Sequence, residues 1–178
     1  MSGRHGVRAR LGALLAAAVL AGCASAPPST TPLLSGRLSV RVDGQPDKSV
    51  SAGFELAGTA ERGSLLLTGP LGTSAAQATW QPGEALLMSG GATQRHPDLD
   101  SLGQAALGEA LPMAAFFDWL HGRAWAGAPS QPRSDGGTGF EQLGWRIDLA
   151  RWGDGLLDAV RLAPPVVTVR ARVEGGGR

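Results

Sequence analysis

Cys23 is the residue best suited to covalent modification, because it is the only cysteine among 178 residues and cannot form a disulfide within the chain. It follows the small residues Ala21 and Gly22, which would let the chain enter a narrow protease site. Three arginines lie within the first ten residues, and residues 11–20 are apolar or small and carry no charge. This run has about half the length of a membrane-spanning helix and is typical of an export signal. The sequence therefore places a reactive thiol directly behind a cleavable leader.

The order of basic residues, apolar run and Leu20-Ala21-Gly22-Cys23 resembles the bacterial lipobox. The resemblance implies that a lipoprotein signal peptidase cleaves before Cys23, that diacylglycerol is attached to the thiol and that the freed amine is acylated. The alternative is an ordinary secretory signal with a cysteine at this place by chance. On the lipobox interpretation, residues 1–22 are a signal peptide and residues 23–32, rich in Pro, Ser and Thr, are a lipidated flexible tether.

The lipid on Cys23 is expected to be a lasting anchor. Each buried methylene adds about 0.8 kcal/mol of membrane affinity, so two or three acyl chains hold a protein in place. Bacterial sorting rules retain a lipoprotein in the inner membrane when aspartate follows the cysteine, and here the next residue is Ala24. By this resemblance we expect a lipid-anchored outer-membrane protein that faces the periplasm. We expect no cofactor other than this covalent lipid.

The charge balance excludes one class of partner. The full chain has 16 basic and 15 acidic side chains, and the leader contains three arginines and no acidic residue. The mature chain therefore keeps 13 basic and 15 acidic side chains, a formal charge of −2. Such a chain lacks the basic excess of a nucleic-acid-binding protein, so we expect no nucleic acid partner.

The polar residues of the mature chain do not have the spacing that catalysis or metal binding requires. His96 precedes Pro97 in an expected loop, His121 lies at an expected helix end, and the two do not have metal-ligand spacing. Asp98 and Asp100 lie at an expected helix start, where an aspartate is more often a cap than a catalyst. No G-x-S-x-G motif occurs, and no G-x-G-x-x-G motif follows an expected strand. We therefore predict no catalytic residue, no metal site and no enzyme activity.

Residues 112–121 (PMAAFFDWLH) are predicted to form an unusually apolar helix. Proline suits the first turn of a helix, where its missing N–H has no partner to lose. The apolar side chains cover more than half of the circumference: Met113, Phe116, Phe117, Trp119 and Leu120. One interpretation is that this helix fills the core of a sheet. The other is that one side of it lines a cavity for an apolar ligand, for which methionine and phenylalanine are well suited.

The segment between two expected strands at residues 64–68 and 76–80 contains a second apolar feature. Glycines flank the pair Pro70-Leu71, and Pro70 together with these glycines favours a tight turn. Leu71 then lies at the tip of the turn, next to Gly72. One interpretation is that Leu71 folds back on the sheet. The other is that Leu71 is an apolar probe that enters a bilayer.

Alternation of apolar and polar residues predicts the elements that carry these features. Strands are expected at 37–43, 50–56, 64–68, 76–80 and 85–88, and again at 145–149, 156–162 and 166–173. Two short helices at 98–107 and 112–121 separate the two groups, and residues 126–139 are expected to be a Gly/Pro/Ser-rich loop. This order is typical of a mainly β (α+β) domain, a curved antiparallel sheet or partial barrel with helices packed in its hollow. We expect the domain to span residues 33–174 and residues 175–178 to be a tail.

Several short motifs together resemble the LolB family of outer-membrane lipoproteins. The motifs occur in the family's order: LSGRLSV at 34–40, GPLG at 69–72, WQPG at 80–83, LP at 111–112, WLHGR at 119–123 and FEQLGW at 140–145. The chain departs from the family at Leu56 and Leu149, where an aromatic residue is common. These two changes affect the expected shape of a cavity but leave its lining apolar.

The resemblance implies a LolA/LolB-like fold, an incompletely closed antiparallel β-barrel with short helices covering an apolar cavity. It implies that the cavity holds the acyl chains of client lipoproteins received from a LolA-like periplasmic carrier. The loop with Pro70, Leu71 and Gly72 would then aid insertion into the inner leaflet of the outer membrane, with the protein acting as a monomer. The candidate cavity-lining residues are Phe54, Trp80, Met113, Phe116, Phe117, Leu120 and Trp145.

Two other functions remain open from the residues alone. A lipocalin-like lipoprotein would bind a small lipid in a similar barrel without handing over a client. A structural accessory of an envelope complex would have no cavity at all. The three hypotheses differ first in whether a cavity exists and then in whether a client is transferred.

Overall fold

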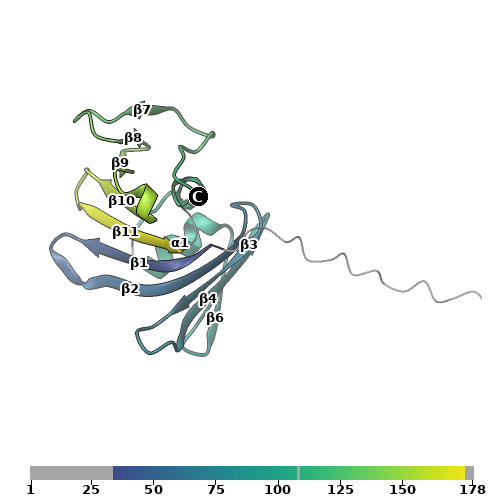
Figure 1. Cartoon of the computed structure of the whole chain (residues 1–178). Helices are drawn as coiled ribbons and strands as arrows, with labels where there is room; N and C mark the ends of the chain where they lie inside the picture. Colours follow the sequence, from purple (N-terminus) through teal and green to yellow (C-terminus); the bar gives the residue numbers. More distant parts are fainter. Residues whose placement is uncertain (1–33, 108, 175–178) are drawn as a thin grey trace, which may run out of the picture.

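The computed structural model describes residues 34–107 and 109–174 (Figure 1). The predicted signal peptide (1–22), tether (23–32) with Cys23, and tail (175–178) lie outside the described residues. None of the described helices is long and apolar enough to cross a membrane.

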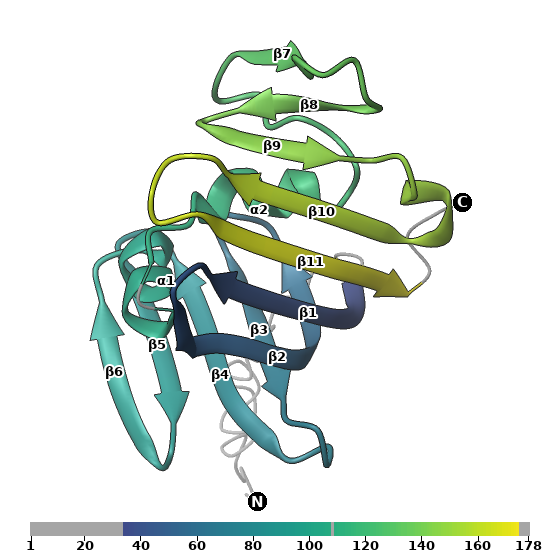
Figure 2. The ribbon, with the colours of Figure 1, turned by 90° about the vertical axis from the view of Figure 1, so that its left-hand side faces the viewer.

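Eleven antiparallel strands form one sheet in the order β6-β5-β4-β3-β2-β1-β11-β10-β9-β8-β7. The strands are β1 (Leu34–Val42), β2 (Gln45–Gly58), β3 (Gly63–Thr68), β4 (Ser74–Gln81), β5 (Glu84–Ser89), β6 (Ala92–His96), β7 (Ser130–Pro132), β8 (Gly139–Gln142), β9 (Trp145–Asp148), β10 (Leu156–Arg161) and β11 (Val167–Glu174). Within the described residues β6 and β7 end the sheet without pairing with each other. The strands β3 to β6 run across the direction of β1, β10 and β11, so the sheet is strongly bent (Figure 2). This confirms the predicted incompletely closed antiparallel barrel.

Alternation of side chains explains why these segments form strands. In β11 the residues Val167, Val169, Ala171 and Val173 are buried, whereas the residues between them are half-buried or exposed. Because successive side chains of a strand point to opposite faces, one face of the sheet becomes apolar and turns inward.

Two helices pack in the hollow of this sheet. The helix α1 (Leu99–Leu107) contacts β5, β6 and α2 (Met113–Trp119). Asp98 caps α1, because its Oδ1 accepts a hydrogen bond from the backbone N–H of Ser101 at 2.7 Å. Five of the seven residues of α2 are buried, as expected for a helix that is apolar on nearly all sides.

The sequence prediction was wrong at four places in the sheet. The strands β6, β7 and β8 were not predicted, and β7 lies inside the expected loop at 126–139. The strand β2 begins at Gln45, five residues before its expected start. The start of β2 and the strands β6 and β7 are mostly exposed on both faces, so their sequences do not alternate. The strand β8 (GFEQ) contains one large apolar residue, Phe140, and its inward residue Gln142 is polar, so it shows no apolar alternation either.

Gln142 is the only buried polar residue among the described side chains, and it joins the helices to the later strands. Its Oε1 accepts hydrogen bonds from Trp119 Nε1 (2.9 Å) and from the backbone N–H of Trp125 (3.0 Å). Its Nε2 donates to the carbonyl oxygens of Trp125 (2.7 Å) and Ala128 (2.8 Å). All the hydrogen-bonding groups of this amide are therefore satisfied inside the protein.

Gln142→Leu is expected to lower the free energy of unfolding by about 3 kcal/mol or more, because buried donors and acceptors lose their partners. Chemical denaturation measures the effect. The control is Gln131→Leu at an exposed position of β7, which should change the stability by less than about 0.5 kcal/mol. Equal effects of the two substitutions would show that the amide network does not stabilise the fold.

Arg133 joins the segments that flank β8. Its guanidinium lies 2.6 Å from the carboxylates of both Asp135 and Asp148. Hydrogen bonds from Arg133 and then from the backbone N–H of Gly137 hold the pKa of Asp135 far below its usual value. The pKa of Asp148 is lowered by a hydrogen bond from the N–H of Ala150 and by Arg133.

These lowered pKa values predict how stability depends on pH. The stabilisation is fully present above the pKa of an unfolded aspartate, about 3.9, and is lost as the pH falls towards the lower folded-state values. Arg133→Gln is therefore expected to flatten the acid side of the stability profile. Denaturation curves below about pH 4 would test this, and parallel profiles for the two proteins would contradict it.

Candidate functional site

A cavity of about 290 Å³ lies between the bent sheet and the two helices. Its walls come from β1 to β5, β11, α1, α2 and the residues near them. The lining residues are Leu38, Val40, Val50, Ser51, Ala52, Phe54, Leu56, Leu65, Leu67, Gly69, Ala75, Ala76, Ala78, Trp80, Leu87, Ser89, Leu99, Leu102, Gly103, Ala106, Leu111, Met113, Phe116, Phe117, Leu120 and Val169.

The lining of this cavity is almost entirely hydrocarbon. It contains no charged side chain, and its only hydroxyl groups belong to Ser51 and Ser89. The indole N–H of Trp80 is satisfied outside the cavity, because it donates to the carbonyl oxygen of Thr59 at 2.8 Å. Burial of apolar surface is non-directional, so such a wall accepts flexible hydrocarbon chains and recognises no particular head group.

The structure places six of the seven candidate lining residues around the cavity. Phe54 and Trp80 come from the sheet, and Met113, Phe116, Phe117 and Leu120 from α2 and its C-terminal end. The rings of Trp80 and Phe117 meet edge to face with centroids 5.4 Å apart, so they join the sheet wall to the helix wall.

Trp145 is the exception, since it lies outside the cavity lining. It is buried in β9, where its ring packs against Trp119 at a centroid distance of 5.9 Å. The guanidinium of Arg161 lies 5.9 Å from the centroid of the same ring. The sequence placed Trp145 on the inward face, but this part of the hollow is filled by Trp119.

Sequence reasoning did not single out the leucines of the cavity, among them Leu38, Leu65 and Leu67. These residues are half-buried although they pack against the core, as expected beside an unfilled space. The alternation of apolar and polar residues assigned each leucine to one face of the sheet. It did not show where other side chains leave that face uncovered.

The cavity reaches the surface near the turns of two β-hairpins. Four of its lining residues are exposed, Ser51, Ala75, Ser89 and Ala106. Ser51 also lines the groove on the other face of the sheet, whereas Ala75 and Ser89 lie next to the two turns and mark this mouth. Gly69, at the beginning of the β3–β4 loop, lines the cavity as well. The loop with Leu71 therefore begins and ends at the mouth.

Leu71 itself is 93% exposed, so it does not fold back on the sheet. The loop is held by hydrogen bonds from the N–H of Gly69 to the carbonyl of Thr73 (2.9 Å) and from the N–H of Gly72 to the carbonyl of Gly69 (2.9 Å). Gly72 has a φ of +74°, which favours glycine at this position. Pro70 and these bonds hold Leu71 outward into solvent.

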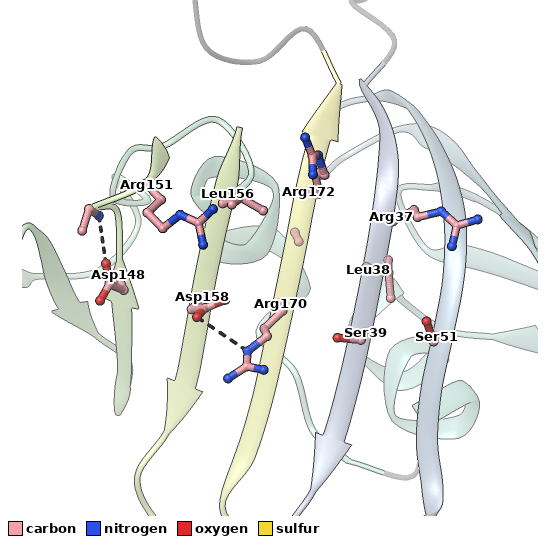
Figure 3. Close-up of a pocket in the computed structure, with 12 residues that line it drawn as sticks. Arg37, Leu38, Ser39, Ser51, Asp148, Arg151, Leu156, Asp158, Arg170 and Arg172 are labelled. Carbon is pink, nitrogen blue, oxygen red and sulfur yellow. Dashed lines mark hydrogen bonds and ion pairs between the residues drawn. The ribbon is translucent and has the colours of Figure 1, made fainter. Parts of the chain in front are cut away.

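A second hollow, of about 550 Å³, lies on the face of the sheet away from the helices (Figure 3). Its side chains come from β1, β2, β10, β11 and the end of β9. It is lined by four arginines and two aspartates, Arg37, Arg151, Arg170, Arg172, Asp148 and Asp158. Burying acyl chains there would desolvate these charges, so this groove does not suit an apolar ligand.

Three of the four residues considered for catalysis, Asp98, Asp100 and His121, contact backbone groups. Asp98 caps α1, and the Oδ1 of Asp100 accepts a hydrogen bond from the backbone N–H of Met113 at 3.0 Å. His121 Nδ1 lies 2.7 Å from the carbonyl oxygen of Phe117, one helical turn earlier. Among the described residues, no group of three or more His, Cys, Asp or Glu side chains could hold a metal ion.

Known proteins share this pattern over most of the chain. The sequence model of the family described as "Outer membrane lipoprotein LolB" matches residues 33–173. The "Outer-membrane lipoprotein LolB" of Bordetella petrii is 34% identical, with 83% of this chain and 82% of the relative covered. The proteins of the same name from Cupriavidus metallidurans and Bordetella pertussis are 32% and 37% identical; the matches cover 94% and 76% of this chain and 89% and 74% of the relatives. The apolar cavity, the exposed loop at its mouth and these similarities lead to one conclusion: the chain belongs to the LolB family of outer-membrane lipoproteins.

Proposed function

We propose that this protein is an outer-membrane lipoprotein that accepts acylated lipoproteins from a periplasmic carrier and inserts them into the outer membrane. The observation that carries the proposal is an apolar, charge-free cavity whose mouth lies beside the exposed Leu71. The names of the relatives support the location in the outer membrane. On this proposal the protein transfers its clients without chemical change and is not an enzyme.

Differential affinity supplies the direction of transfer. A client moves from a LolA-like carrier to this cavity when the cavity binds its acyl chains more tightly, and it then moves to the bilayer if burial there is more favourable still. The hydrophobic effect does not distinguish between clients, so proteins of unrelated sequence can use the same cavity.

The size of the cavity implies movement of its walls. A volume of about 290 Å³ lies at the lower limit of ligand pockets, which range from about 300 to 1,000 Å³. Several acyl chains need more room, so we propose that α1 and α2 move away from the sheet during uptake. Met113 suits such a wall, because its unbranched side chain adapts to changing shapes.

The direct test is transfer between purified proteins. The full chain is mixed with a LolA-like carrier loaded with an acylated client, and vesicles are added in a second step. We expect the client to leave the carrier for this protein and then to float with the vesicles. Binding of free lipid without removal of the client from the carrier would support the lipocalin-like alternative. Absence of both would contradict a lipid-handling function.

We propose that Cys23 carries the lipid anchor and that the protein has no other prosthetic group. Cys23→Ala is expected to move the protein from the membrane fraction to the soluble periplasmic fraction, because the acyl chains are lost. Fractionation followed by immunoblotting measures this, with Ser25→Ala as a control that leaves the thiol in place. Membrane association that survives Cys23→Ala would reveal a different anchor.

A further inference from the structure

The turn between β5 and β6 lies at the same end of the molecule as the loop with Leu71. Strand register fixes this arrangement, since Ala76 pairs with Ser89 and Gln77 with Met88 between β4 and β5. Gly90 and Gly91, both with positive φ, form the turn that leads into β6. Both turns protrude at the lower end of the molecule in the two ribbon views (Figures 1 and 2).

The two hairpins carry no charged residue in or near these turns. Residues 64–83 and 85–94 contain no Asp, Glu, Lys or Arg. The charges nearest in sequence to the β5–β6 turn are Glu84 and Arg95, which form an ion pair with atoms 3.1 Å apart away from the turn. Met88 is 44% exposed, and the residues from Ser89 to Gln94 are exposed as well. Leu87 is buried and lines the cavity, so Met88 lies on the opposite face of β5, beside the turn. An exposed turn without charges enters an apolar environment without the cost of desolvating a charge.

The cavity opens at this same end. Ser89 lines the cavity next to the β5–β6 turn, and Ala75 lines it next to the β3–β4 loop. Both turns therefore border the mouth through which, on the proposed function, acyl chains leave. A single contact at Leu71 leaves the mouth free to tilt away from the bilayer, whereas a second contact holds the mouth against it.

We propose that the β5–β6 turn, residues 88–93, is a second membrane-contacting element and that its partner is the interfacial region of a phospholipid bilayer. The inference rests on the proposed function and extends it to a part of the chain far from Leu71 in sequence. The contact is made by Met88 and uncharged small residues, so it does not depend on the charge of the lipid head groups. The bilayer buries Met88 while the Glu84–Arg95 pair stays in water.

Single-cysteine variants of the full lipidated chain test the proposal. Because the native cysteine is Cys23, lipidation leaves an introduced cysteine as the only free thiol. A polarity-sensitive fluorophore is attached at Leu71→Cys, Met88→Cys or Leu162→Cys. Leu162 is the matched control, because it is 50% exposed and lies beyond β10, outside both turns. The labelled proteins are placed in phosphatidylcholine vesicles that contain a spin-labelled quencher lipid, with and without phosphatidylglycerol.

We expect quenching and a blue shift at positions 71 and 88 and neither at position 162, to the same degree in both lipid mixtures. Quenching at 71 without quenching at 88 would overturn this inference and leave the role of Leu71 intact. Loss of quenching at both positions would contradict the membrane role of the Leu71 loop too. Quenching at all three positions, or at 88 only with phosphatidylglycerol, would also overturn the proposal.

A second measurement links the contact to transfer. Met88→Glu is expected to reduce client delivery to vesicles about tenfold, because an apolar side chain leaves the interface and a charge takes its place. Met88→Leu and Leu162→Glu are expected to retain delivery. Circular dichroism and uptake of client from the carrier show whether Met88→Glu is folded. A folded Met88→Glu variant with normal delivery would contradict the proposal.

Discussion

Leu71→Glu is expected to reduce delivery of clients into a bilayer about a hundredfold while uptake from the carrier stays near normal. Removal of an apolar side chain from the bilayer costs about 3 kcal/mol, and every 1.4 kcal/mol corresponds to a factor of ten. Uptake stays near normal because the side chain of Leu71 is 93% exposed to solvent and is not part of the cavity lining. The stability of the fold stays unchanged because the loop is held by hydrogen bonds between backbone atoms and not by the Leu71 side chain.

Two assays separate these effects of Leu71→Glu. Uptake is measured in a Cys23→Ala background without vesicles, as client moved from the carrier to this protein. Delivery is measured with the lipidated chain in vesicles, as client that floats with them. Leu71→Met keeps an apolar tip and is expected to behave like the wild type. An equal fall of uptake and delivery in Leu71→Glu would show that the loop supports the structure and does not enter the membrane.

Ala76→Phe is expected to abolish client uptake without loss of stability. Ala76 lies on β4, lines the cavity near its mouth and is half-buried. A phenylalanine ring there occupies space that acyl chains need. Because the ring enters an unfilled space, the free energy of unfolding should change by less than about 1 kcal/mol.

The control for Ala76→Phe is the same change at Ala159. Ala159 is fully buried in β10 between Val169 and Ile147 and does not line the cavity. Ala159→Phe is therefore expected to destabilise the protein by about 1–3 kcal/mol through overpacking. Denaturation curves and carrier-to-receptor transfer measure the two effects. Normal uptake by Ala76→Phe, or destabilisation equal to that of Ala159→Phe, would show that this space is not where acyl chains bind.

Each of the two interpretations of the α2 sequence describes only one side of this helix. Its sequence allowed either a core plug or a cavity wall. In the structure Phe116 and Phe117 line the cavity, while Trp119 is fully buried against Trp145 and Gln142. The helix does both, because its two sides face parts of the sheet that are filled to different extents.

The sequence by itself determined the main strands, the two helices, the tight turn at Leu71 and the family of the chain. These features depend on neighbouring residues: alternation, helical spacing and turn residues act over a few positions. Strands β6 and β7 were not predicted because they are held by backbone pairing and not by an apolar face. Strand β8 was not predicted because its buried residue is the polar Gln142.

Only the tertiary structure decided where the hollow is empty. Alternation showed that Trp80 and Trp145 both point inward, but only Trp80 faces the cavity, since Trp119 fills the space beside Trp145. Strand register brought Ser89 beside Ala76 and so placed a second turn at the mouth. The volume of a cavity depends on side chains that come from segments far apart in the sequence. A pattern of neighbouring residues therefore does not predict it.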